Sequence, residues 1–275
     1  MTDRPLPWFG PGQDPGPSFS ALLAASAPQL RPEARLNDPA GPPDVPHGTT
    51  VVALRYDAGV LMAGDRRATS GYSIAGRRME KVQPADEHSG VAIAGAAGPA
   101  MEMVKLFQTE LEHYEKVEGE PLSLEGKANR LAQMIRSNLP AAMQGLAVVP
   151  LFAGYDQHRE QGRLFQYDVT GGRYEELDYH ATGSGSVHAR NWIKAQWRDG
   201  MVRDDVVDLA IQALFNAADE DAATGGPDVV RGIYPQVATI EADGFTMLDD
   251  DEVRVRTTTL LDRLGAAASG PEGDA

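Results

Sequence analysis

Thr49 is the residue of this chain whose setting best suits covalent chemistry. It follows Gly48 directly, and residues 51–56, the first convincing strand-forming run, begin two positions later. A threonine hydroxyl is a weak nucleophile at neutral pH and needs a base within hydrogen-bond reach. Cleavage after Gly48 would supply that base, because Thr49 would then carry a free α-amine with a pKa of ~7.7 to 8.0. The sequence therefore predicts cleavage between Gly48 and Thr49, with Thr49 as nucleophile and base.

Histidine offers no better base. His47 lies in the segment that cleavage would remove. The other five fall in expected turns, on exposed helix faces or at strand ends, where a surface role is the ordinary one: His88, His113, His158, His180 and His188. We therefore favour the terminal amine over an imidazole.

Asp65 and Lys81 follow Thr49 at even intervals along the chain. An ammonium beside Thr49 would lower the pKa of its hydroxyl and of its amine, which favours the reactive forms. A lysine buried without a counter-charge would lose its proton, so Asp65 is its expected partner. Spacing alone leaves open that Asp65 and Lys81 form a surface pair or are unrelated turn residues.

Three further residues are candidates. Gly95 lies where a strand gives way to a helix, so its backbone N–H could point at a developing oxyanion. An ordinary turn is the alternative, because glycine is common there. Ser184 and Asp221 lie in loops beside helix ends, where N-capping is the usual role of a hydroxyl or carboxylate. The sequence alone leaves open whether Gly95 is only a turn residue and whether Ser184 and Asp221 are only helix caps.

Composition limits the classes of function. The chain has 275 residues, 42% of them hydrophobic, which is enough for a sizeable core. A net charge of -15 argues against nucleic-acid and anionic-membrane surfaces, because like charges repel. The absence of cysteine excludes disulfides, thiolate zinc sites and cysteine nucleophiles. No apolar run approaches the ~20 residues of a membrane span, and residues 19–25 lack the basic flank of a secretory signal.

The segment before Thr49 differs in composition from the rest of the chain. Residues 1–48 are rich in proline and glycine, so little regular structure is expected beyond a brief helix near residues 18–26. This leader is either a disordered tail or a propeptide that shields the future terminus. From residue 49 the pattern becomes that of one large domain ending near residue 264, with a disordered tail over 265–275.

Hydrophobic periodicity predicts strands, two helices, strands, two helices, strands and a last helix. Expected strands cover residues 51–56, 60–63, 90–94, 148–155, 162–168, a run up to Tyr179, 237–242 and 245–248. Expected helices cover 104–118, a segment from Ser123 interrupted near Pro140, one through Trp197, 204–219 and 251–264. Each sheet face and helix stripe needs a partner, so the predicted fold is α+β, a four-layer αββα sandwich.

Six motifs then match one family in order and separation. They are Gly48 to Leu54, Met62 to Arg67, Lys81, Ile93-Ala94-Gly95, Gly183-Ser184-Gly185-Ser186 and Asp221 to Gly226. With them, residues 49–250 resemble the β subunits of the core proteasome, most of all the actinobacterial type with its long propeptide. The leader and the C-terminal tail lie outside the resemblance.

The resemblance implies an N-terminal nucleophile hydrolase fold and autocatalytic removal of residues 1–48. It implies that Thr49 is nucleophile and base, that Asp65 and Lys81 form the charged pair, and that Gly95 gives the oxyanion N–H. Supporting roles follow for Ser184, Asp221, Thr224 and Arg67. Thr224 replaces the serine more usual in the family and keeps the hydroxyl.

The resemblance also implies a substrate cleft lined by Ala68, Thr69, Met79, Ile93, Gly95 and Ala97. Thr69 and Ala97 would pair with the substrate as an added strand. Because this lining is small, apolar and uncharged, we expect cleavage after hydrophobic residues.

The implied partners are proteasome subunits and their substrates. Two homo-heptameric β rings would lie between two rings of α subunits in the cytoplasm, fed by a ring ATPase with proteins tagged by a ubiquitin-like modifier. No nucleic acid, membrane, cofactor or metal is expected.

Three rivals share the fold. A two-ring bacterial peptidase also begins with paired threonines, but it usually has almost no propeptide. A non-catalytic ring subunit would lack the threonine after glycine or the lysine. An amidase would usually begin with cysteine or serine.

Overall fold

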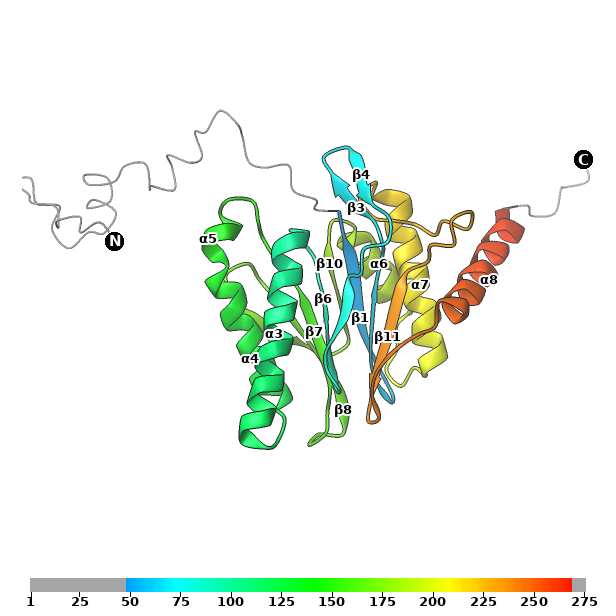
Figure 1. Cartoon of the computed structure of the whole chain (residues 1–275). Coiled ribbons are helices and arrows are strands. Elements are labelled where there is room, and N and C mark those ends of the chain that lie inside the picture. Colours follow the sequence, from blue (N-terminus) through cyan, green and yellow to red (C-terminus); the bar gives the residue numbers. More distant parts are fainter. Residues whose placement is uncertain (1–47, 269–275) are drawn as a thin grey trace, which may run out of the picture. The chain divides into compact units, whose positions relative to one another are not determined.

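The computed structural model describes residues 48–268, which are drawn in colour in Figure 1. The brief helix expected near residues 18–26 lies outside the described residues, as does the part of the expected tail beyond residue 268.

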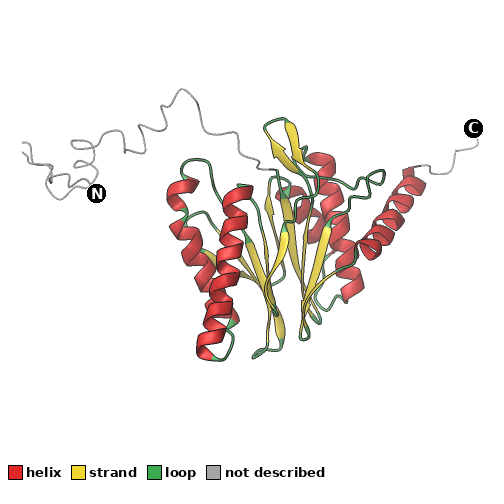
Figure 2. Ribbon diagram, viewed as in Figure 1, coloured by secondary structure: helices red, strands yellow, loops and turns green. Residues whose placement is uncertain are grey.

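Two five-stranded antiparallel sheets lie face to face, with helices on both outer surfaces (Figures 1 and 2). The first sheet has the order β10 (Tyr179–Gly183), β1 (Thr50–Tyr56), β2 (Gly59–Gly64), β11 (Gln236–Glu241) and β12 (Gly244–Met247). The second has the order β5 (Val82–Asp86), β6 (Ser89–Ala92), β7 (Leu151–Asp156), β8 (Gln161–Tyr167) and β9 (Arg173–Glu176). The predicted αββα sandwich is confirmed.

The helices form the two outer layers. On the second sheet lie α3 (Ala97–Glu118) and α4 (Leu124–Ser137), followed by the short α5 (Leu139–Ala142). On the first sheet lie α6 (Ser186–Gln196), α7 (Arg203–Glu220) and α8 (Asp250–Ala268). Gly119, with φ 79°, ends α3, and the Ser123 hydroxyl caps α4 by accepting from Gly126 N.

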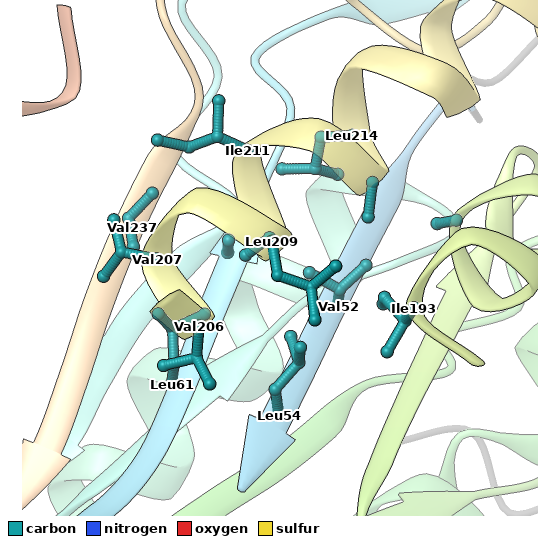
Figure 3. Packing of buried hydrophobic residues seen from close by; sticks show 14 of the residues in the cluster. Val52, Leu54, Leu61, Ile193, Val206, Val207, Leu209, Ile211, Leu214 and Val237 are labelled. Atoms are coloured by element: carbon teal, nitrogen blue, oxygen red, sulfur yellow. The ribbon is translucent and has the colours of Figure 1, made fainter. Parts of the chain in front are cut away.

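Strand β1 shows why the sequence turns abruptly apolar after Thr49. Val51 and Ala53 face the second sheet, whereas Val52 and Leu54 face the helices on the other side. Figure 3 shows Val52 and Leu54 packed against Leu209 of α7 and Ile193 of α6. A strand buried on both faces reads as a continuous hydrophobic run, and a slip of one residue would exchange its two faces.

Four sequence-based expectations were wrong. No strand was expected over residues 82–86, where the structure has β5. The run up to Tyr179 is two strands, β9 and β10, and β10 pairs with β1. A hairpin of β3 (Ala68–Ser70) and β4 (Ser73–Gly76), which was not expected, follows β2. The last helix runs past residue 264 to Ala268, because the alanines after Gly265 are strong helix formers that offset the glycine.

The second sheet packs on its helices through three phenylalanines. Phe152 is fully buried, edge-on to Phe107 at 5.9 Å and stacked with Phe165 at 6.0 Å. We predict that Phe152→Ala lowers the free energy of unfolding by about 3–5 kcal/mol, because it leaves a cavity between sheet and helix. Urea denaturation of the unassembled chain measures the change. Val230→Ala, at a side chain 94% exposed, is the control and should shift it by less than about 0.5 kcal/mol. Equal effects of the two substitutions would contradict this packing.

Candidate active site

Thr49 lies at the entry to the first sheet, held between two neighbouring strands. The register places Thr50 opposite Gly183 of β10, and Val51 opposite Gly64 of β2. Gly183 has φ +102°, and a Cβ there would lie 2.0 Å from Thr49 O, so only glycine fits. Thr49 itself is 2% exposed.

The uncut peptide bond lies against the two groups expected to act on it. Thr49 Oγ1 donates to Gly48 O at 2.7 Å, and Lys81 Nζ donates to the same oxygen at 3.1 Å. The Lys81 ammonium and the Thr49 hydroxyl therefore converge on the carbonyl that precedes Thr49.

Lys81 pairs with Asp65, as expected from its need for a counter-charge. Lys81 Nζ lies 2.6 Å from Asp65 Oδ1, and both side chains are fully buried. The alternative of a surface pair is therefore wrong. Burial is the largest influence on Lys81 and lowers its pKa below the ordinary value, and Asp65 restores it only in part.

Four donors satisfy the Asp65 carboxylate. Oδ1 accepts from Thr50 N at 2.8 Å and from Lys81 Nζ, while Oδ2 accepts from Arg67 N and Gly225 N, each at 2.8 Å. A buried charge is tolerated when it is paired and fully hydrogen-bonded. Arg67 also binds Ala222 O through Nη1 at 2.9 Å, which ties the strand end to the loop after α7.

Gln236 is a residue of this site that sequence reasoning missed. Its Oε1 accepts from Lys81 N at 2.6 Å and from Val82 N at 3.3 Å, so it fixes the backbone on which Lys81 stands. A glutamine at the start of a strand carries no sequence signal for this role.

Ser184, Asp221 and Thr224 meet on the other side of Thr49. Ser184 N donates to Thr49 O at 2.8 Å, and Ser184 Oγ lies 3.3 Å from Thr49 O and 2.5 Å from Asp221 Oδ2. Thr224 Oγ1 donates to Asp221 Oδ2 at 2.6 Å. Burial opposes ionisation of Asp221, but the hydrogen bonds from Ser184 and Thr224 outweigh it and lower the pKa of this carboxyl.

The N-capping alternative is wrong for Ser184 and Asp221. Helix α6 begins after Gly185 without a side-chain cap, and Asp221 follows the C-terminal end of α7. Their side chains bind one another instead, although they are far apart in the sequence.

Gly95 lies between β6 and α3 with φ +106°. It forms an isolated bridge with Val148, whose hydrogen bonds run from Ala96 N to Ala147 O and from Val149 N to Ala94 O. The Gly95 N–H takes no part in that bridge, which leaves it suited to an oxyanion.

The expected cleft residues lie on β3, at the start of α3, and in the segments just before β5 and just after β6. Thr69 is beside Gly48, where an added Cβ would come within 2.3 Å of Thr69 Oγ1. At Thr69, strand β3 has β4 as its one neighbouring strand among the described residues, which suits pairing with an extended peptide. Ile93 is buried in the apolar cluster of the second sheet with Met79 packed against it. Ala68 and Ala97 are half-buried.

Among the hydrogen bonds of residues 48–268, none joins a histidine to Thr49. Burial lowers the pKa of His180 to about 4, so this imidazole is neutral at working pH. Within the same residues, His, Asp and Glu side chains form no group that could hold a metal, and no helix could span a membrane.

Known proteins are similar to this sequence over most of its length. The proteasome subunit family model matches residues 45–231. A proteasome subunit beta of Acidimicrobium ferrooxidans is 57% identical over 264 residues, 95% of this chain and 96% of the relative. Those of Acidothermus cellulolyticus and Streptomyces griseus are 59% and 55% identical, covering 90% and 97% of this chain and 87% and 94% of the relatives. With a family model over most of the chain and relatives along nearly all of it, the chain belongs to the proteasome subunit family, as a β subunit.

Proposed function

We propose that this chain is a proteasome endopeptidase whose nucleophile is Thr49, freed by cleavage after Gly48. One observation carries the proposal. The Thr49 hydroxyl and the Lys81 ammonium both donate to the carbonyl oxygen of Gly48, and Asp65 holds the ammonium in place.

In the uncut chain, Thr49 Oγ1 attacks the carbonyl carbon of Gly48. Lys81 stabilises the negative charge that develops on the carbonyl oxygen, because it already donates to that atom. The C–N bond then breaks and the hydroxyl proton ends on the departing nitrogen, which leaves an ester between Gly48 and Thr49. Water hydrolyses the ester, so residues 1–48 leave as a propeptide and Thr49 becomes the N-terminus.

In the cut enzyme, the same hydroxyl attacks a substrate carbonyl while the Thr49 amine takes its proton. The substrate C–N bond then breaks as the amine passes this proton to the leaving nitrogen, and water hydrolyses the ester left on Thr49, which releases the second product and restores the hydroxyl. Lys81 favours the deprotonated hydroxyl, and the Gly95 N–H donates to the oxyanion. Ser184, through its bonds to Thr49 O and Asp221, holds the nucleophilic residue in place.

The proposed setting is a core particle of two seven-membered β rings between two α rings, in the cytoplasm. A ring ATPase would feed it unfolded proteins, including those tagged with a ubiquitin-like modifier. The relatives named proteasome subunit beta support this setting over the two-ring peptidase, because their alignments extend into the leader. The presence of Thr49, Asp65 and Lys81 in one buried network supports catalysis over a purely structural ring subunit.

We predict that Thr49→Ala abolishes both cleavage of the leader and peptide hydrolysis, because the attacking oxygen is lost. Intact-mass analysis after mixing with the matching α subunit should show only the full precursor for this variant. The parent chain should yield a species that begins at Thr49. Thr49→Ser keeps an attacking hydroxyl and should still be cut. Leader removal in the Thr49→Ala variant would refute self-cleavage.

Lys127 provides a matched control for Lys81, because it is 5% exposed and pairs with Asp86 at 2.5 Å, away from Thr49. Lys81→Met should lower the free energy of unfolding by about 3–5 kcal/mol, because it leaves the buried Asp65 carboxylate without its counter-charge. Lys127→Met should lower it by less, because the Asp86 side chain is 18% exposed and keeps hydrogen bonds from Ser89 and His88. Only Lys81→Met should also lower kcat of the assembled peptidase, by at least about 100-fold. Urea denaturation and peptide hydrolysis measure the two effects. Equal loss of kcat in both variants would show that Lys81 acts only through stability.

The lining proposed for the cleft predicts which substrate residue is preferred immediately before the cut bond. Peptides with leucine, phenylalanine or tyrosine before the cut bond should have kcat/KM at least about tenfold above those with arginine or glutamate there, because no charge in the lining would pair with a charged side chain. Fluorogenic peptides that differ only at this position measure the ratio. A preference for arginine or glutamate would reject the proposed lining.

A further inference from the structure

We propose that Thr50 is a positioning residue that joins the two carboxylates of the site and so aims the freed Thr49. This inference rests on the proposed function. Its evidence is a set of bonds made by the backbone and side chain of Thr50, which is fully buried.

The Thr50 backbone is fixed to Asp65. Thr50 N donates to Asp65 Oδ1 at 2.8 Å, and Thr50 O accepts from Asp65 N at 3.1 Å. The oxygen that accepts from Thr50 N is the one that holds the Lys81 ammonium. The backbone of Thr50 is therefore held in register with the Lys81 charge.

The Thr50 hydroxyl is fixed to Asp221 through Thr224. Thr50 Oγ1 lies 2.6 Å from Thr224 Oγ1, whose own proton goes to Asp221 Oδ2. Because an ionised carboxylate only accepts, Thr224 must accept from Thr50. Thr50 Oγ1 in turn accepts from Gly185 N at 2.9 Å. The charge on Asp221 thus sets the directions of the bonds from Thr224 to Asp221 and from Thr50 to Thr224, and the third direction is fixed because a backbone N–H can only donate.

The Gly185 backbone lies close to these bonds, and both threonines are fully buried. A Cβ placed on Gly185 would lie 2.6 Å from Thr50 Oγ1 and 2.7 Å from Thr224 Oγ1. Replacing Thr50 with valine keeps the shape and the strand preference, but it leaves the Gly185 N–H unpaired and takes away the donor to Thr224.

The hydrogen bonds that hold Thr50 act as an anchor for Thr49, and cleavage after Gly48 makes this anchor more important. Before the cut, Thr49 is covalently attached to Gly48 on one side and to Thr50 on the other. Gly48 is itself tightly enclosed, because an added Cβ there would lie 2.6 Å from Ala223 O. After the cut, Thr50 is the only residue covalently attached to Thr49. The position of the amine and hydroxyl then depends on how firmly Thr50 is held.

The test is Thr50→Val in the assembled particle, with Thr50→Ser to restore the hydroxyl. Thr239→Val is the matched control, because Thr239 is a 4% exposed threonine on β11 of the same sheet. For Thr50→Val, kcat should fall at least about tenfold, with KM and the rate of leader removal each changed by less than about threefold. Thr50→Ser should regain most of kcat, and Thr239→Val should leave it unchanged.

Parental kcat in Thr50→Val would overturn the inference but leave the proposed function standing, which depends on Thr49. Equal loss of kcat and of leader removal would also overturn it, because the anchor would not act mainly after the cut. If Thr50→Val fails to assemble, Thr224→Val breaks the same path to Asp221. Parental kcat in that variant would overturn the inference as well. A Thr50→Val, Thr224→Val double variant should be no slower than the slower single variant, since both interrupt one path.

Discussion

The site depends on keeping an ammonium charged in a place that water does not reach. Burial lowers the pKa of Lys81, so the lysine stays useful only because a carboxylate faces it. Burial is also unfavourable for the ionised carboxylate of Asp65. Four donors from separate segments stabilise it: Thr50, Arg67, Lys81 and Gly225. The need to satisfy Asp65 thus explains why β1, the end of β2, the start of β5 and the loop after α7 meet at one point.

The sandwich makes this meeting possible. Strand β1 is buried on both faces, so its register is fixed by packing, and Thr49 enters at a defined height between β2 and β10. The loops then approach closely where side chains are absent. Gly183 comes up to Thr49 O, and Gly225 N reaches Asp65. The rigid core fixes the positions, and the glycines let the backbone donate where a side chain would collide.

The sequence predicted the layers because they follow from local rules: alternating and helical periodicity indicated two sheets with helices outside. The charged pair was different, because spacing left open whether Asp65 and Lys81 meet, and only the family resemblance singled them out. Gln236, Thr50 and the link from Ser184 to Asp221 could not be predicted from spacing. Their roles arise from contacts between segments that are distant in the sequence, and each residue type is ordinary in its local setting. Strand β10 was missed for the same reason, since its pairing with β1 identifies it better than its own residues do.

Under the proposed mechanism, the uncut chain needs no separate inhibitor. The nitrogen that is to act as base is still part of the Gly48–Thr49 peptide bond, and an amide nitrogen does not take up a proton near neutral pH. Thr49 is also 2% exposed, with its hydroxyl directed to the Gly48 carbonyl. The first carbonyl that the hydroxyl can attack is therefore the one whose cleavage creates the base. In the proposed mechanism, activation and catalysis therefore use one set of side chains, and the covalent state of Thr49 decides which reaction they perform.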